Sequence, residues 1–212
     1  MALLFGFEAP DVRDAIRLQD TIGVECGSET DRRRSIRLHG HDYSWPGEYF
    51  VTICAHEKQH LFGQVVEAKM QLNALGEAVW KEWRFSARIR AEIELDEFIV
   101  MPNHVHAIVR IVGADGVHPG FAGGHTAMAE LGAHGRAPLP PGRAPRSLGS
   151  FVAGFKAAAT SSINRIRRMP GTPVWQRNYY EHIVRHPHEL DAFRDYIRTN
   201  PARWDTDPEN CR

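Results

Sequence analysis

Cysteine is scarce in this sequence, and its three cysteines lie far apart. Cys26, Cys54 and Cys211 are odd in number and share no short spacing, so neither a disulfide framework nor a cysteine-rich zinc site is indicated. No apolar run approaches the roughly 20 residues that a membrane-spanning helix requires. Residues 1–11 also lack the basic start and the small-residue cleavage pattern of a secretory signal. We therefore expect a cytoplasmic protein without a membrane partner.

A charge excess is also lacking, because 26 basic and 26 acidic residues cancel. The charges are unevenly distributed, however. Nine basic residues lie between positions 136 and 185 against the single acid Glu181, and a second basic cluster consists of Arg32, Arg33, Arg34 and Arg37. A neutral total can hide a positive face, and binding to a phosphate backbone requires only that face. The same clusters also fit an ordinary solvated surface, so charge alone leaves both interpretations open.

One domain with extensions is the simplest organisation for 212 residues with 42% hydrophobic content. Residues 1–31 show no clean periodicity and are expected to form a poorly ordered or accessory N-terminal extension. The domain then spans residues 32–204. A flexible insertion rich in glycine and proline interrupts it at 113–147, and residues 205–212 are expected to be a C-terminal tail.

Hydrophobic periodicity predicts seven elements inside this domain. Helices are expected at about 73–84, 148–168 and 188–199, with Asn73 as an N-cap and Pro187 in the first turn of the last helix. Strands are expected at 48–55, 89–101, 104–112 and, less regularly, 174–184. This order predicts an α+β fold of the ferredoxin-like kind, with an antiparallel sheet, helices on one face and one extra C-terminal helix.

Two histidines open the third predicted strand. Because successive side chains of a strand point to opposite faces, His104 and His106 share one face, about 6.5–7 Å apart along the backbone. Val105, Ala107 and Val109 then form an apolar stripe on the other face. Two imidazoles placed in this way can converge on one metal ion. A histidine in a strand is, however, more often a surface residue or a hydrogen-bonded core residue than a ligand.

The last predicted helix offers a third element for such a site. Tyr196 and Asn200 are four residues apart and therefore lie on one helical face, about 5–6 Å apart. If that face packs over the histidines, Asn200 can supply an oxygen ligand while Tyr196 points toward the group that the metal polarises. Such a ligand set suits Mg²⁺ or Mn²⁺. Spacing alone does not exclude Tyr179 or Tyr180 as the reactive tyrosine.

Three separated motifs resemble a known family. They are residues 101–106 (Met-Pro-Asn-His-Val-His), residues 174–182 (Val-Trp-Gln-Arg-Asn-Tyr-Tyr-Glu-His) and residues 194–201 (Arg-Asp-Tyr-Ile-Arg-Thr-Asn-Pro). Together they resemble the single-tyrosine HUH, or IS200-like, transposases and, within them, the branch of REP-associated tyrosine transposases. The similarity runs from about Arg32 to Trp204 and leaves residues 1–31 and 113–147 without a counterpart.

The resemblance implies metal-dependent cleavage and joining of single-stranded DNA beside hairpins such as REP-like palindromes. It implies that Tyr196 is the nucleophile, that a 5′-phosphotyrosine intermediate forms, and that His104, His106 and Asn200 bind Mg²⁺ or Mn²⁺. A nucleoid-associated protein, monomeric or homodimeric, is expected. Whether Tyr196 acts on the metal site of its own chain or of a partner stays open.

Contacts to DNA are expected from basic, polar and aromatic residues, because these groups bond to phosphates or stack on unpaired bases. The candidates are Arg32, Arg33, Arg34, Arg37, Tyr43, Lys156, Arg177, Asn178 and Arg185. Two other hypotheses compete with the transferase. One is a catalytically silent protein that binds DNA or RNA hairpins, and the other is a metal hydrolase that uses His182, His186 or His188.

Overall fold

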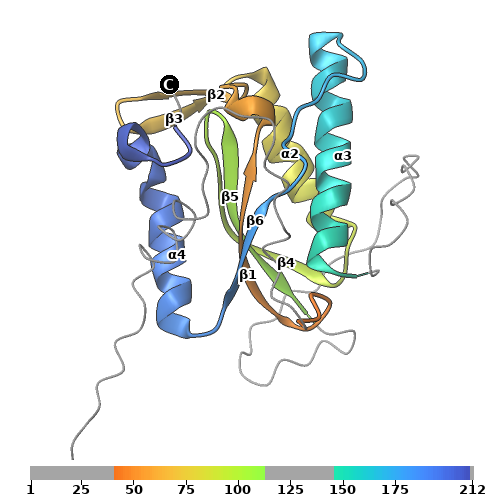
Figure 1. The fold of residues 1–212 in the computed structure, drawn as a ribbon, viewed down its shortest axis with the longest axis vertical. Helices are drawn as coiled ribbons and strands as arrows, with labels where there is room; N and C mark the ends of the chain where they lie inside the picture. Colours follow the sequence, from red (N-terminus) through yellow and green to blue (C-terminus); the bar gives the residue numbers. More distant parts are fainter. Residues whose placement is uncertain (1–40, 113–145, 211–212) are drawn as a thin grey trace, which may run out of the picture.

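A computed structural model describes residues 41–112 and 146–210 (Figure 1). The predicted extension at 1–31, the predicted DNA contacts Arg32, Arg33, Arg34 and Arg37, and nearly all of the insertion at 113–147 lie outside these residues. The described residues form a four-stranded antiparallel sheet in the order β4-β5-β1-β6. The strands are β1 (Gly47–Cys54), β4 (Ile93–Val100), β5 (His104–Ile111) and β6 (Tyr180–Val184). This is the ferredoxin-like arrangement that the sequence predicts.

Two helices cover one face of the sheet, α2 (Ala74–Arg88) and α3 (Leu148–Arg167) (Figure 1). The predicted cap of α2 is confirmed, because the Asn73 side chain accepts hydrogen bonds from the backbone N–H groups of Leu75 and Gly76. Ser147 caps α3 in the same way, through the N–H of Ser150. Both helices bury their apolar stripes against the stripe of β5 that consists of Val105, Ala107 and Val109. This face holds the main hydrophobic core.

A third helix, α4 (Pro187–Thr199), lies across the other face of the sheet (Figure 1). Pro187 occupies its first turn, where a missing N–H costs nothing. Phe193 stacks on Phe50 of β1 with ring centroids 4.4 Å apart, and Ile197 packs in the same cluster. The 3₁₀-helix η2 (Asn200–Thr206) continues directly from α4. The helix that carries Tyr196 is therefore docked on the histidine face.

A bulge in β4 strengthens this docking. The register of β4 against β5 shifts between Leu95 and Phe98, and the two residues in between, Asp96 and Glu97, form ion pairs with α4. Arg194 binds both oxygens of Asp96, and Arg198 binds one oxygen of Glu97. Bulges commonly redirect side chains in this way. The two arginines are one helical turn apart and fix the rotation of α4 on the sheet.

One hairpin was not predicted. Strands β2 (Gly63–Val66) and β3 (Lys69–Leu72) pair between the short 3₁₀-helix η1 (His56–Lys58) and α2. Its two-residue turn places Glu67 and Ala68 at φ of 49° and 59°, a conformation for which glycine and asparagine are the usual sequence signal. The sequence lacks that signal here, which is why the predicted elements include no strand between residues 56 and 72.

Element boundaries otherwise differ from expectation by a few residues. Helix α2 continues four residues beyond the predicted end at position 84, and β4 starts at Ile93 rather than 89. In the predicted strand 174–184 only the last part forms β6, while Trp175 makes an isolated bridge to Ala55. Among the described residues, no helix is both long enough and apolar enough to cross a membrane.

Candidate metal site facing a tyrosine

The two histidines of β5 lie side by side in the interior. His104 and His106 are both 0% exposed, and their ring centroids are 4.3 Å apart at an angle of 63°. They share the face that α4 covers, as the strand alternation predicts. Burial disfavours the charged form of an imidazole, so each ring needs polar partners or a ligand to satisfy its nitrogens.

One ring nitrogen of His104, Nε2, has no hydrogen-bond partner in the described part of the chain. Its Nδ1 lies 2.8 Å from Oδ1 of Asn103. The Asn103 amide donates from Nδ2 to the carbonyls of Lys58 and Glu209, so its oxygen is the acceptor and Nδ1 of His104 carries the proton. Nε2 then presents a lone pair, and this buried atom has no hydrogen-bond partner. In metal-binding histidines, the ring nitrogen that does not bind the metal is usually hydrogen-bonded to a neighbouring group, which orients the ring. Asn103 is such a group for His104.

His106 is oriented from two sides. Its Nδ1 lies 2.9 Å from Oγ1 of Thr52, and its Nε2 lies 3.4 Å from the hydroxyl of Tyr196. Burial lowers the pKa of His106 to about 3. Burial, reinforced by the neighbouring His106 and Lys58, also holds the pKa of His104 well below its ordinary value. Both rings are therefore neutral at physiological pH, which is the form that binds metals.

A third group comes from the segment after α4. One ligand atom each of His104, His106 and Asp207 lie within 4.8 Å of one another, and Asp207 is 7% exposed. Burial raises the pKa of the Asp207 carboxyl, while hydrogen bonds from Asn200 and from the N–H of Glu209 act against that rise. The sequence predicts a tail at 205–212, and residue 207 contributes to the site. No local pattern marks this aspartate, because only the packing of the segment after α4 against the sheet brings it to the histidines.

Asn200 lies at the same site, with its amide oriented by Asp207. Its Nδ2 donates to Oδ2 of Asp207 over 2.6 Å, and its buried Oδ1 has no hydrogen-bond partner. The amide oxygen is thus free to accept, as the predicted role of a metal ligand requires. The same side chain also holds the Asp207 carboxylate in place.

The segment that carries Asp207 is anchored by its own contacts. Glu209 forms an ion pair with Lys58, with Nζ and Oε2 3.1 Å apart, and accepts from the Cys54 thiol at 3.3 Å. Asn103, which orients His104, also donates to the Glu209 carbonyl at 2.7 Å. One asparagine therefore ties a histidine of the sheet to the C-terminal segment.

The donor set suits a divalent cation. Two neutral imidazoles and a buried carboxylate lie together, and the Asn200 amide bonds to that carboxylate. The Nε2 of His104 and the Oδ1 of Asn200 have no hydrogen-bond partner among the described residues. Burial of a carboxylate is costly. The charge of Lys58 offsets part of that cost for Asp207, and a bound cation would offset more of it. Mixed nitrogen and oxygen ligands of this kind suit Mn²⁺ better than Mg²⁺, which prefers oxygen alone.

Among the three candidate tyrosines, Tyr196 is the one whose hydroxyl lies at the candidate metal site. Its hydroxyl lies 3.4 Å from Nε2 of His106 within the same chain, and the two ring centroids are 5.1 Å apart. Tyr179 instead packs against the core on the opposite face. Tyr180 lies beside Phe50, and burial raises its pKa to about 12, which makes its phenolate harder to form.

The predicted DNA contacts within the described residues divide into two groups. Arg177, Asn178 and Arg185 are exposed, as a DNA contact requires. Tyr43 is only 9% exposed and packs in the main core beside Tyr49, so its ring offers little surface to a base. Its role in DNA binding stays a prediction.

Lys156 is also engaged within the chain. Its Nζ donates to the carbonyls of Gln176 and Asn178 over 2.9 and 2.8 Å. Lys156 therefore anchors the segment before β6, and its role as a DNA contact stays a prediction.

The histidines of the competing hydrolase hypothesis do not form a comparable cluster. His182 pairs with Glu189 at 2.6 Å, which links β6 to α4, and the rings of His186 and His188 stack on each other. Within 41–112 and 146–210, the group of His104, His106 and Asp207 is the one that brings three potential metal ligands together.

Fold and site together define a ferredoxin-like α+β domain in which a candidate metal centre faces a helical tyrosine. No protein-family model matches the chain. An uncharacterized protein of Haemophilus influenzae is 37% identical over 175 residues, which cover 82% of this chain and 91% of that protein. The chain belongs to the same family as that protein.

A solved structure is similar as well. It is that of a REP-associated tyrosine transposase bound to a REP hairpin, with a TM-score of 0.49 and 15% sequence identity, and the match covers 80% of this chain and 74% of that one. Because the TM-score lies below 0.5, the function proposed below rests on the side chains of this chain.

Proposed function

We propose that this protein is a metal-dependent nuclease and strand transferase for single-stranded DNA, with Tyr196 as the nucleophile and a DNA hairpin beside the cleaved strand. The observation that carries the proposal is the placement of the Tyr196 hydroxyl 3.4 Å from His106, within the buried group that also contains His104 and Asp207. The three motifs in the sequence supply the expectation of DNA as substrate.

The proposed reaction balances without a nucleotide cofactor. The Tyr196 oxygen attacks a phosphodiester phosphorus, a bond from phosphorus to the tyrosine oxygen forms, and the bond to the 3′ oxygen breaks. The tyrosine proton leaves the nucleophile, and the departing 3′ oxygen takes up a proton. The products are a 5′-phosphotyrosine and a free 3′-hydroxyl, and the reverse attack by a 3′-hydroxyl rejoins a strand.

Other residues of the chain would bind the metal ion or orient its ligands. His104, His106 and Asp207 would hold the cation, Asn200 would bind it or orient Asp207, and Thr52 and Asn103 orient the two rings. A divalent cation at this site, for which we favour Mn²⁺ over Mg²⁺, would withdraw charge from the phosphate and align it for in-line attack.

Rigid docking of α4 supports the role of Tyr196. A tyrosine with an ordinary pKa near 10 is almost entirely protonated at neutral pH, so its reactivity depends on accurate placement. The paired arginines of α4 on Asp96 and Glu97, together with Phe193 on Phe50, hold the helix on the sheet of its own chain. We therefore propose that Tyr196 acts on the metal site of the chain that carries it.

The test is formation of a covalent adduct. The protein is incubated with Mn²⁺ and a pool of DNA hairpins that carry a randomised single-stranded flank and a 3′ label, because the segment downstream of the cut stays on the tyrosine. A labelled protein band is expected after denaturing electrophoresis. Chelation of the metal should abolish it, and so should Tyr196→Phe.

Tyr179→Phe and Tyr180→Phe are the matched controls, since each removes one hydroxyl from a neighbouring tyrosine and should leave the adduct intact. An adduct that survives in Tyr196→Phe would refute the assignment of the nucleophile. Hairpin binding without any adduct in the native protein would instead support the catalytically silent hairpin-binding protein.

A further inference from the structure

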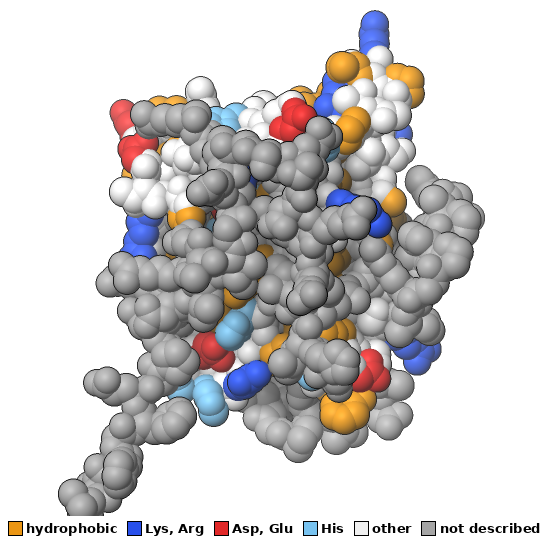
Figure 2. Space-filling model, viewed as in Figure 1, with side chains coloured by type: hydrophobic (Ala, Val, Ile, Leu, Met, Phe, Trp, Pro, Cys, Tyr) orange, Lys and Arg blue, Asp and Glu red, His pale blue; other side chains and the backbone are white. Residues whose placement is uncertain are grey.

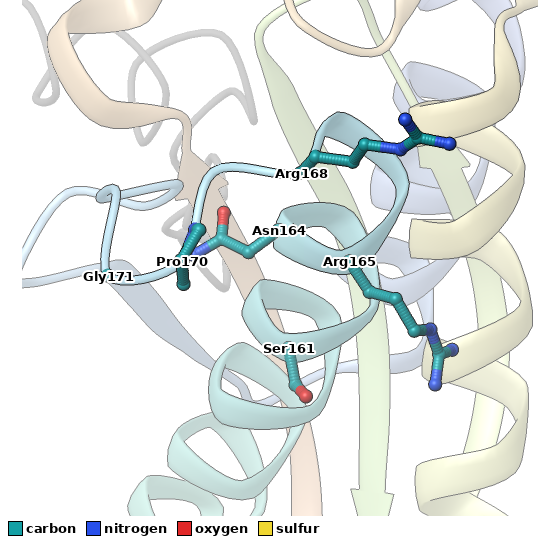
Figure 3. A pocket seen from close by; sticks show the side chains of 6 residues that line it. All are labelled: Ser161, Asn164, Arg165, Arg168, Pro170 and Gly171. Carbon is teal, nitrogen blue, oxygen red and sulfur yellow. The ribbon is translucent and has the colours of Figure 1, made fainter.

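A hollow lies outside the metal site, at the C-terminal end of α3 (Figure 3). It measures about 560 Å³ and is lined by Ser161, Asn164, Arg165, Arg168, Pro170 and Gly171. Arg165 and Arg168 extend to the same side of the helix end (Figure 3). Basic side chains also gather at this projecting end in the space-filling view (Figure 2). Nothing in the proposed reaction uses these residues.

A neighbouring arginine builds the turn that shapes this hollow. Arg167 donates to the carbonyls of Thr172 and Pro173 and to the Asn164 side chain, while Asn164 itself donates to Thr172. The helix ends at Arg168, whose φ of 56° is left-handed. The turn is therefore held by side chains, and Arg167 is fully engaged in holding it.

Arg165 and Arg168, unlike Arg167, do not hold the turn. Both are exposed, and within the described parts of the chain neither guanidinium forms a hydrogen bond or an ion pair. From position 131 to position 180 the sequence contains no acidic residue. The partial negative charge at a helix C-terminus repels anions, so the two arginines would supply the attraction for a negatively charged partner.

The hollow and the metal site lie at the same end of the molecule. In Figure 1 the C-terminal ends of α3 and α4 are at the same end of the sheet. The chain that leaves the hollow runs beside the end of β1, where Trp175 bridges Ala55 and the Gln176 N–H donates to the Cys54 carbonyl. Cys54 in turn pairs with His104. One extended segment thus connects the arginines to the edge of the proposed site.

We propose that Arg165 and Arg168 bind the phosphate backbone of the DNA stem while the adjoining single strand enters the site of Tyr196. This inference rests on the proposed function, because the hairpin is the substrate proposed there. Proteins that hold unpaired strands use aromatic side chains on which bases stack. The hollow is lined by no aromatic residue, and phosphate contacts of this kind fix register without reading sequence.

The test compares two double variants in a binding assay. Fluorescence anisotropy of the native protein, of Arg165→Gln/Arg168→Gln and of Arg84→Gln/Arg88→Gln is measured with a DNA hairpin that has one helical turn of stem and a short single-stranded extension. Arg84 and Arg88 are exposed on α2, so the second variant removes the same charge elsewhere. Arg167 is left unchanged because it holds the turn.

Arg165→Gln/Arg168→Gln should lower hairpin affinity by about tenfold near 0.1 M salt. The slope of log K against log salt should also become smaller in magnitude by about 1.8, because each of the two phosphate contacts contributes about 0.9. Arg165→Lys/Arg168→Lys should recover most of the affinity. The α2 variant should resemble the native protein. An unpaired strand of equal length should bind equally to all variants.

Four outcomes would overturn the inference. They are unchanged hairpin affinity, an equal loss in the α2 variant, an equal loss on the unpaired strand, and a dependence on these arginines that appears only with an RNA hairpin. Hairpin binding and adduct formation are measured in separate assays. Absence of any adduct with normal, arginine-dependent hairpin binding would count against the proposed function and leave the stem contact standing.

Discussion

The two faces of the sheet differ in what they bury. Among the described residues, the face under α2 and α3 packs 23 buried hydrophobic residues in one cluster. The face under α4 packs six such residues. It also buries polar side chains, among them His104, His106, Thr52 and Asn200. The same strands serve both faces, because alternate residues of β1 and β5 point to opposite sides.

This difference shows how the domain tolerates a costly site. Buried polar groups stabilise a fold only when they are well paired, and the α4 face leaves Nε2 of His104 and Oδ1 of Asn200 without partners. The larger core on the other face supplies the apolar burial that drives folding. The larger core and the proposed site thus lie on opposite sides of one sheet.

The largest expected effect is the loss of stability when a buried ring is deleted from either face of the sheet. Phe155→Ala in the main core and Phe193→Ala under α4 each delete a fully buried ring, at a cost of about 3–5 kcal/mol. Phe155→Ala should lower amide protection across β1 and β5, whereas Phe193→Ala should expose mainly α4. Native-state hydrogen exchange measures both. Equal loss of protection in β1 and β5 in the two variants would break the distinction.

The next effect concerns the metal site. Asp207→Asn keeps the shape of the side chain but removes its charge, so Mn²⁺ affinity measured by calorimetry should fall by about 100-fold or more, beyond the 10–100-fold typical of groups that only support ligands. Asp205→Asn, an exposed acid in the same segment, should leave the affinity unchanged. Equal affinities in Asp207→Asn and the native protein would remove Asp207 from the ligand set.

A smaller effect is expected at the hydroxyl that orients His106. Thr52→Val removes the group 2.9 Å from Nδ1 and keeps the volume, so Mn²⁺ affinity should fall by about tenfold. Thr52→Ser restores the hydroxyl and should bind Mn²⁺ nearly as the native protein does. If Thr52→Ser loses as much as Thr52→Val, packing of the methyl group rather than the hydrogen bond is responsible.

The smallest effect tests the docking of α4 through pH. Burial acts to raise the pKa of Asp96, but the hydrogen bonds and charge of Arg194 outweigh it and hold that pKa below 3.8. A carboxyl with a lowered folded-state pKa stabilises the fold above its unfolded pKa and loses that contribution as pH falls through the folded value. Stability measured by urea unfolding should therefore fall more steeply below about pH 4 in the native protein than in Asp96→Asn.

The magnitude of this last effect is about 1 kcal/mol, because the pair is partly exposed. Glu97→Gln removes the more exposed pair with Arg198 and should change the unfolding free energy by about 0.5 kcal/mol or less. Parallel pH profiles for the native protein and Asp96→Asn would show that Asp96 does not contribute to docking.

Much of the fold could be predicted because its signals are local. The alternation in β5, the Asn73 cap and Pro187 in the first turn of α4 each depend on neighbours within a few residues. The β2–β3 hairpin was missed because Glu67 and Ala68 adopt positive φ without the glycine or asparagine that usually marks such a turn. The burial of Tyr43 could not be predicted, because it depends on packing against Tyr49 of β1.

The sequence by itself determined that two histidines share one face of a strand and that Tyr196 and Asn200 share one face of a helix, because the strand and helix repeats are short-range. Only the tertiary structure decided that these two faces meet, that Asp207 joins them, and that Lys156 holds a backbone segment. Contacts between residues about a hundred positions apart depend on how elements pack, and periodicity does not encode that packing.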